Sequence, residues 1–221
     1  MSKNERYKWP QFSSKEINAV KKVISSGKVN YLTGEEGKKF ESEYARWCGT
    51  KYAIALANGT LALEVALKSI NIKKGDEVIV TPRSFIASVS CVINMGGIPK
   101  FADVDENSGN ITTQTIRKLI SAKTKAIICV HLGGLPCEMD GITTLAKKNN
   151  LYLIEDCSQA HGASYKGKKV GSIGHIGTWS FCQDKIISTG GEGGMITTNN
   201  RSLYEKIWSF KDHGKNRKKL N

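Results

Sequence analysis

The chain has 221 residues, of which 39% are hydrophobic and 24% charged, an ordinary composition for a soluble globular protein with a sizeable core. No apolar run approaches the roughly 20 residues of a membrane helix, and the polar start lacks a signal-peptide hydrophobic region, so we expect a cytoplasmic protein without a membrane partner. The net charge of +13 is scattered and has no recognition motif beside it, so it suits an anionic small substrate better than nucleic acid.

The first part of the sequence is a lead-in to an alternating pattern. Ser13 or Ser14 with Glu16 can cap a helix that ends at Gly27, and a loop precedes an amphipathic helix over 36–48. Short apolar runs typical of strands then alternate with helical segments. The predicted strands are 52–57, 77–81, 99–104, 125–132, 151–155, 177–182 and 195–198, and the predicted helices are 60–70, 84–95, 112–120 and 139–149, with a last helix and its exit at 208–214. This alternation predicts an α/β fold with a mainly parallel sheet covered by helices on both faces.

The cysteines indicate neither a disulfide framework nor a metal centre. Six are present, none of them in a Cys-x-x-Cys pair, and several lie in apolar runs where a small buried thiol is common. We therefore expect no metal.

The residues that follow the predicted strands are candidates for a binding site, because open sheets of this kind bind ligands at the carboxyl ends of their strands. Gly59 and Thr60 end a strand and open a helix, whose free amides favour phosphate; a plain strand-to-helix turn is the alternative. Asp156 could pair with a pyridine nitrogen, or it could cap the next segment. His131 ends another strand, where it could touch substrate or be satisfied by backbone.

Lys185 stands between a strand-like run and a glycine-rich turn over 189–194. In water a lysine amine has a pKa of roughly 10.4, and only the neutral form attacks carbonyls. Burial or a neighbouring cation lowers that pKa, which is the usual route to a Schiff-base lysine. Taken alone, a lysine beside glycines is more often a surface residue.

Two stretches together resemble a known family. One is Ser180-x4-Lys185 followed by Thr-Gly-Gly-Glu-Gly-Gly at 189–194, and the other is Glu-Asp-Cys-Ser-Gln-Ala-His-Gly-Ala at 155–163. Both are similar to signatures of the DegT family of sugar aminotransferases, which are pyridoxal-phosphate (PLP) enzymes of fold type I. The resemblance extends from about Gly27 to the C-terminus. Cys157 and Ser158 stand where the family commonly has alanines, which we expect to be tolerated.

The resemblance implies a fold and a role for each site residue. It implies the large PLP-binding domain of that class, with a seven-stranded-type mixed sheet and helices on both faces. Lys185 would hold the cofactor as a Schiff base. The remaining cofactor contacts would be Asp156 to the pyridine nitrogen, Gln159 to the phenolic oxygen, Gly59, Thr60 and Ser180 to the phosphate, and Phe85 stacked on the ring. His161 matches the family pattern, but its role is open.

By the same resemblance, the chain would transaminate a nucleotide-linked keto sugar, with glutamate as the expected amino donor, in a homodimer with a shared active site. One alternative is the family's dehydratase branch, which replaces the lysine with histidine; another is an inactive basic binding or regulatory protein with this fold. Family members continue into a smaller C-terminal domain, so we expect residues 1–221 to comprise the lead-in and the large domain of a truncated chain.

Overall fold

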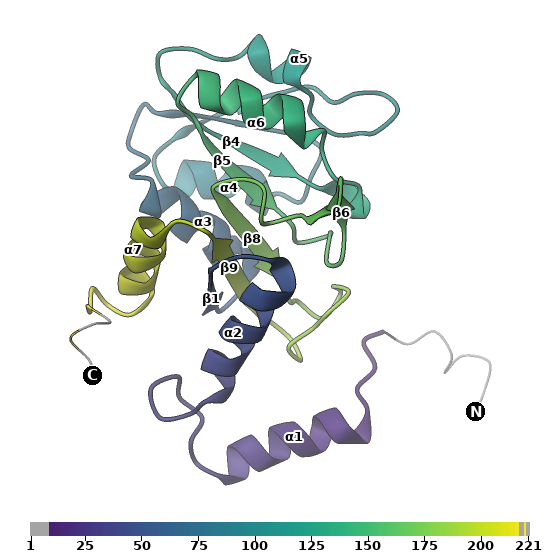
Figure 1. Cartoon of the computed structure of the whole chain (residues 1–221), viewed down its shortest axis with the longest axis vertical. Coiled ribbons are helices and arrows are strands. Elements are labelled where there is room, and N and C mark those ends of the chain that lie inside the picture. Colours follow the sequence, from purple (N-terminus) through teal and green to yellow (C-terminus); the bar gives the residue numbers. More distant parts are fainter. Residues whose placement is uncertain (1–8, 217–218, 220–221) are drawn as a thin grey trace.

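The computed structural model describes residues 9–216 and 219, which are built around a central sheet (Figure 1). Its strands are β1 (Tyr52–Leu56), β2 (Glu77–Val80), β3 (Ile98–Phe101), β4 (Thr124–Val130), β5 (Tyr152–Asp156), β8 (Ile176–Ser180) and β9 (Gly194–Thr198). They are arranged in the order β1-β9-β8-β5-β4-β2-β3. The pairs from β8 to β3 are parallel, whereas β9 runs antiparallel to both β8 and β1. The predicted seven-stranded, mainly parallel mixed sheet is confirmed.

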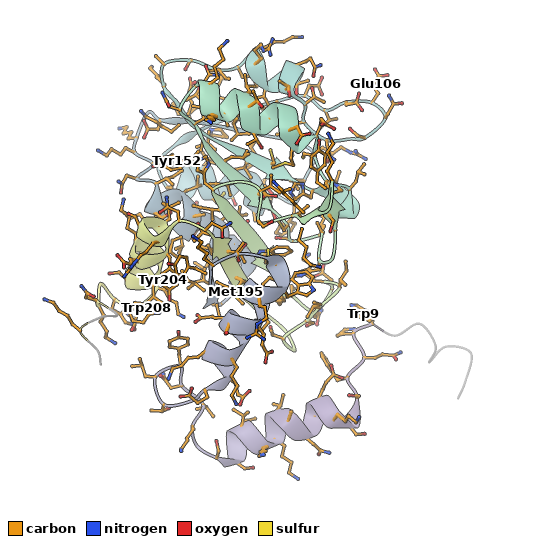
Figure 2. The ribbon with its side chains drawn as sticks, in the orientation of Figure 1. Trp9, Glu106, Tyr152, Met195, Tyr204 and Trp208 are labelled. Atoms are coloured by element: carbon orange, nitrogen blue, oxygen red, sulfur yellow. The ribbon has the colours of Figure 1, made fainter. Side chains whose placement is uncertain are left out.

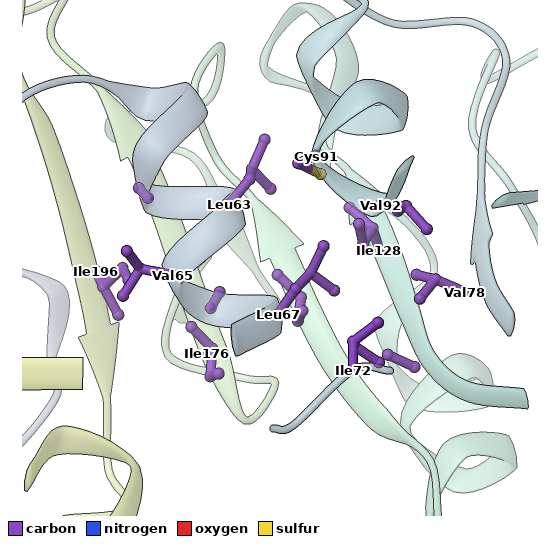
Figure 3. Packing of buried hydrophobic residues seen from close by; sticks show 14 of the residues in the cluster. Leu63, Val65, Leu67, Ile72, Val78, Cys91, Val92, Ile128, Ile176 and Ile196 are labelled. Atoms are coloured by element: carbon purple, nitrogen blue, oxygen red, sulfur yellow. The ribbon is translucent and has the colours of Figure 1, made fainter. Parts of the chain in front are cut away.

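Helices cover both faces of this sheet, as predicted. One face carries α3 (Gly59–Ser69), α4 (Ala87–Asn94) and α7 (Arg201–Lys211), and the other carries α2 (Glu36–Cys48), α5 (Thr113–Arg117) and α6 (Met139–Lys148). Neighbouring side chains of a strand point to opposite faces, so Val78 joins the first core and Ile79 the second. Figure 3 shows Leu63 and Leu67 of α3 in the first core, with Ile128 of β4 near α4. Burial of these apolar side chains on both faces holds the strand ends in a fixed arrangement.

The lead-in helix α1 (Ser14–Ser25) lies apart from the sheet (Figure 1). Its predicted cap is present, because Ser13 and Glu16 exchange side-chain-to-backbone hydrogen bonds in a capping box. None of its residues is buried within the described structure. No helix within residues 9–216 and 219 is both long and apolar enough to span a bilayer.

Several boundaries differ from the predictions; the strand predicted to reach residue 104 ends at Phe101, and the helix predicted to reach residue 120 ends at Arg117. The last helix begins at Arg201, not near 208, because Asn200 caps it by accepting a hydrogen bond from the amide of Leu203 (3.1 Å). Tyr204 of this helix (Figure 2) packs against the first core and stacks its ring on that of Tyr52 in β1. Helix α4 begins at Ala87, so residues 84–86 form a loop. The strand predicted to reach residue 132 ends at Val130.

The small hairpin of β6 (Ser164–Tyr165) and β7 (Lys168–Lys169) was not predicted, because strands of two residues carry no recognisable periodicity.

Candidate active site

A cavity of about 640 Å³ opens at the carboxyl ends of β5 and β8, beside the first turn of α3. This volume falls in the range of small-molecule sites, about 300 to 1,000 Å³. Its lining includes the seven residues predicted to contact the cofactor, but not His131: Gly59, Thr60, Phe85, Asp156, Gln159, Ser180 and Lys185. Residues far apart in the sequence therefore meet at one edge of the sheet.

Asp156 ends β5 and is buried at the cavity. Its Oδ1 accepts a hydrogen bond from the amide of Ser158 (3.1 Å), and its Oδ2 accepts one from the hydroxyl of Ser88 (2.9 Å). Each oxygen of the carboxylate is thus held by one donor of the protein. Each oxygen keeps a further lone pair, so the group can still accept an N–H from a ligand.

Gln159 is held by the backbone of the neighbouring loop. Its Oε1 accepts the amide of Gly133 (2.8 Å), in the short turn after β4. With its oxygen occupied, Gln159 offers the two N–H groups of its amide nitrogen to an anionic oxygen in the cavity.

The start of α3 closes tightly onto the end of β8. The side chain of Asn58 caps the helix by accepting a hydrogen bond from the amide of Leu61 (2.8 Å). The amides of Gly59 and Thr60 belong to the first turn, where backbone N–H groups have no partner within the helix. A Cβ at Gly59 would lie only 2.7 Å from the Cβ of Ser180. Glycine is therefore required for this approach, which places helix amides and a serine hydroxyl around the same part of the cavity.

Lys185 lies in the loop of the β8–β9 hairpin, and its side chain is 20% exposed. The loop is held by backbone hydrogen bonds from Gln183 to Gly191 (2.9 Å) and from Lys185 to Cys182 (3.0 Å). The Nζ of Lys185 pairs with a carboxylate oxygen of Asp184 (2.9 Å), and this hydrogen bond lowers the pKa of Asp184. The lysine is thus a half-buried amine at the cavity wall rather than a fully solvated surface residue.

Phe85 also lines the cavity, but it is 69% exposed, in the loop before α4. The sequence predicted a helix from residue 84, with Phe85 in its first turn; instead α4 begins at Ala87, two residues after Phe85. The ring is therefore carried by a loop at the cavity mouth.

The two histidines whose roles were open are buried. His131 donates from Nε2 to Glu155 (3.0 Å) and accepts the amide of Cys137 at Nδ1 (3.1 Å), so both ring nitrogens are used by the protein. His161 contacts the carbonyl of Ser180 through Nε2 (2.8 Å) and the hydroxyl of Tyr44 through Nδ1 (2.9 Å). Burial lowers the pKa of His161, so the ring is neutral at neutral pH and holds the end of β8 through its hydrogen bond to Ser180.

Glu155, next to Asp156, points to the other side of β5 and organises the loop over 170–174. Its Oε1 accepts the amides of Ile173 (2.8 Å) and Gly174 (2.6 Å), and its Oε2 accepts the amide of Gly171 (2.9 Å) as well as His131. Glu155, His131 and Cys157 offer ligand atoms close enough together to hold a metal ion. The carboxylate of Glu155, however, already accepts hydrogen bonds from four donors of the protein.

Sequence reasoning assigned no role to several polar residues that line the cavity, among them Ser84, Ser88, Gln183 and Glu192. Ser88 left one signal, a polar residue within the apolar stretch that forms α4. Its partner, Asp156, lies 68 positions along the chain, so the sequence alone could not pair them.

The chain is similar to known aminotransferases in both sequence and structure. The sequence profile of the DegT/DnrJ/EryC1/StrS aminotransferase family matches residues 10–221. The crystal structure of an aminotransferase from Psychrobacter cryohalolentis superposes with a TM-score of 0.95 at 60% identity, covering 96% of this chain and 54% of that one.

Two curated relatives act on nucleotide sugars by name. The chain is 43% identical over 209 residues to a GDP-perosamine synthase of Escherichia coli O157:H7, covering 93% of this chain and 56% of the relative. It is 42% identical over 205 residues to a dTDP-3-amino-3,6-dideoxy-alpha-D-galactopyranose transaminase of Aneurinibacillus thermoaerophilus, covering 92% and 56%. The chain thus spans about half the length of the relatives it matches.

Proposed function

Because the chain belongs to the DegT/DnrJ/EryC1/StrS aminotransferase family, we propose that it forms the cofactor-binding domain of a PLP-dependent sugar aminotransferase. Its substrate would be a nucleotide-linked keto sugar and its amino donor glutamate. The observation that carries the proposal is the meeting of Lys185, Asp156, Gln159 and the α3 start at one cavity. The names of the relatives support a nucleotide sugar, but they differ in the nucleotide.

PLP is the cofactor of the family's aminotransferases, and the cavity residues fit it. The close approach of Gly59 to Ser180 gathers donors for a phosphate, and buried Asp156 is an acceptor for a ring N–H. Gln159 lines the cavity with its Oε1 already bonded to Gly133, which leaves its amide N–H groups for a phenolic oxygen. When bound, the group supplies an electrophilic carbon and a ring that delocalises an electron pair from the substrate.

The chain's own residues would bind the cofactor and move protons. Lys185 in its neutral form is the nucleophile that holds the cofactor. Once free of the cofactor, its Nζ would be the base that moves the proton at the donor's α carbon. Asp156 would pair with the ring nitrogen of the cofactor and favour its protonated form.

We also propose that a second subunit completes the site. Phe85, which lines the cavity, and the next residue, Ile86, are 69% and 65% exposed, so two large apolar side chains stand uncovered beside the site. Covering them with a partner subunit would bury this surface and close the cavity to water.

The test of the proposed function is trapping of the cofactor. PLP is added, the visible spectrum is recorded, and borohydride reduction is followed by mass mapping of the modified residue. We expect a yellow band that borohydride removes, with the adduct on Lys185.

A matched pair of variants makes this test specific. Lys185→Ala should bind PLP without forming the adduct and without transaminating. Lys169→Ala removes a lysine that lies over the ring of Trp47 (4.3 Å), outside the residues that line the cavity, and should retain both properties. Turnover by Lys185→Ala, or an adduct on another lysine, would contradict the proposal. Product analysis separates the dehydratase alternative, since a dehydratase removes a sugar hydroxyl without adding an amine.

A further inference from the structure

Three side chains form a directed hydrogen-bonded chain behind the cavity. Ser88, in the first turn of α4, is 1% exposed, and its Oγ donates to Oδ2 of Asp156 (2.9 Å). The Oγ of Ser84 lies 2.9 Å from that of Ser88. A serine hydroxyl has one proton, and Ser88 gives it to the carboxylate. Ser84 is therefore the donor to Ser88, and the chain runs from Ser84 through Ser88 to Asp156.

We propose that Ser88 is a positioning residue that sets the charge of Asp156 and, through it, the protonation of the cofactor's ring nitrogen. This inference rests on the proposed function. The proton between a carboxylate and a pyridine nitrogen stays on nitrogen when the carboxylate is the weaker base. A hydroxyl that donates to the carboxylate stabilises its charge and so weakens it as a base. Donation from Ser84 polarises Ser88 and strengthens this effect in a buried site.

The charge of Asp156 is stabilised by hydrogen bonds rather than by a neighbouring cation. Two buried thiols lie near enough to interact electrostatically with Asp156: Cys91 on α4, and Cys157 after β5, whose sulfur lies with Glu155 and His131. Burial raises the pKa of both thiols, that of Cys91 to about 12. They are therefore neutral thiols that do not offset the negative charge. Lys185 lines the same cavity from the β8–β9 loop, but its Nζ contacts Asp184. The donors to the carboxylate oxygens are Ser88 and the amide of Ser158.

The chain also couples two cavity walls. Ser84 directly precedes Phe85 in the loop before α4. Its hydrogen bond to Ser88 therefore ties the loop that carries the aromatic ring to the residue that orients Asp156. A displacement of this loop would be transmitted to the carboxylate through one hydroxyl.

The test uses two variants of equal shape. Ser88→Thr keeps the hydroxyl and Ser88→Val lacks it, so their difference reports the hydrogen bond and not the packing. Ser88→Ala also removes the hydroxyl, and it does so without the extra methyl group that Thr and Val add. Ser90→Ala removes a hydroxyl from the same helix and is the control. Each protein is loaded with PLP labelled with ¹⁵N in the ring, and the ¹⁵N chemical shift is followed between about pH 6 and pH 10.

We expect the wild type, Ser88→Thr and Ser90→Ala to keep the ring nitrogen protonated to the same pH. In Ser88→Val and Ser88→Ala, the ratio of protonated to neutral nitrogen should fall about ten- to hundredfold, as loss of a hydrogen bond to a charged group predicts. If Ser88→Val titrates like Ser88→Thr, the inference is wrong while the proposed function stands. If the wild type forms no borohydride-trapped adduct on Lys185, the proposed function fails, and the inference with it.

Discussion

Replacing Glu155 with glutamine would test whether one buried carboxylate holds the wall behind the site. Four donors converge on its two oxygens, two on each. Glutamine keeps one acceptor oxygen but presents an NH₂ group in place of the other. Whichever way the amide is turned, that NH₂ meets two donors, so two of the four hydrogen bonds are lost.

The size of the effect follows from these two bonds. Each hydrogen bond to a charged group contributes about 1.5 to 3 kcal/mol. We therefore expect Glu155→Gln to lower the free energy of unfolding by about 3 to 6 kcal/mol, a large share of the 5 to 15 kcal/mol that is typical of a domain.

Urea unfolding, monitored by circular dichroism, measures this loss. The control is Glu106→Gln, the same chemical change in an exposed loop at the periphery (Figure 2), which should alter stability by less than about 0.5 kcal/mol. Hydrogen exchange gives a local readout, because the amides of Gly171, Ile173 and Gly174 should exchange faster in Glu155→Gln. A loss below about 1 kcal/mol, with unchanged exchange at these amides, would refute the reasoning.

Two further predictions concern the end of β8. The folded His161 has a pKa lowered by burial, so as pH falls below about 6.5 the unfolded chain takes up the proton first and the protein loses stability. His161→Phe should therefore show a flatter stability profile in urea unfolding below that pH, with a remaining slope from His175, whose pKa burial also lowers; an unchanged slope would contradict this. Gly59→Ala should weaken PLP binding about tenfold or more, measured by spectroscopic titration, because a Cβ at 2.7 Å forces the helix away from Ser180. Gly191→Ala, where a Cβ meets nothing within 4 Å, is its control, and equal affinities in the two variants would disprove the steric explanation.

The sequence predicted the layers of the fold because their signal is local. Apolar runs of strand length alternate with helical periodicity, and the strands β2, β4 and β5 were placed within two residues. Prediction failed where the deciding contact was a single side chain. The start of α7 depends on the cap at Asn200, although the buried Leu203, Ile207 and Trp208 recur at helical spacing.

The candidate site was predictable to a different degree. The rule that ligands bind at carboxyl ends of strands directed attention to Asp156, and the resemblance added Gln159 and Ser180. Their common position around one cavity is a tertiary fact that spacing does not contain. Ser88 illustrates the limit: it lies in α4 while its partner ends β5, and only the folded chain shows that its hydroxyl meets a carboxylate.

The pairing of β1 with β9 has a consequence for synthesis on the ribosome. β1 leaves the exit tunnel early, yet its neighbour in the sheet is formed by residues 194–198. At about 5 to 20 residues per second, several seconds or more pass before that neighbour emerges. During this interval β1 has an unpaired edge that other nascent chains can join. Slower translation before residue 194 should therefore lengthen the period in which a chaperone is needed.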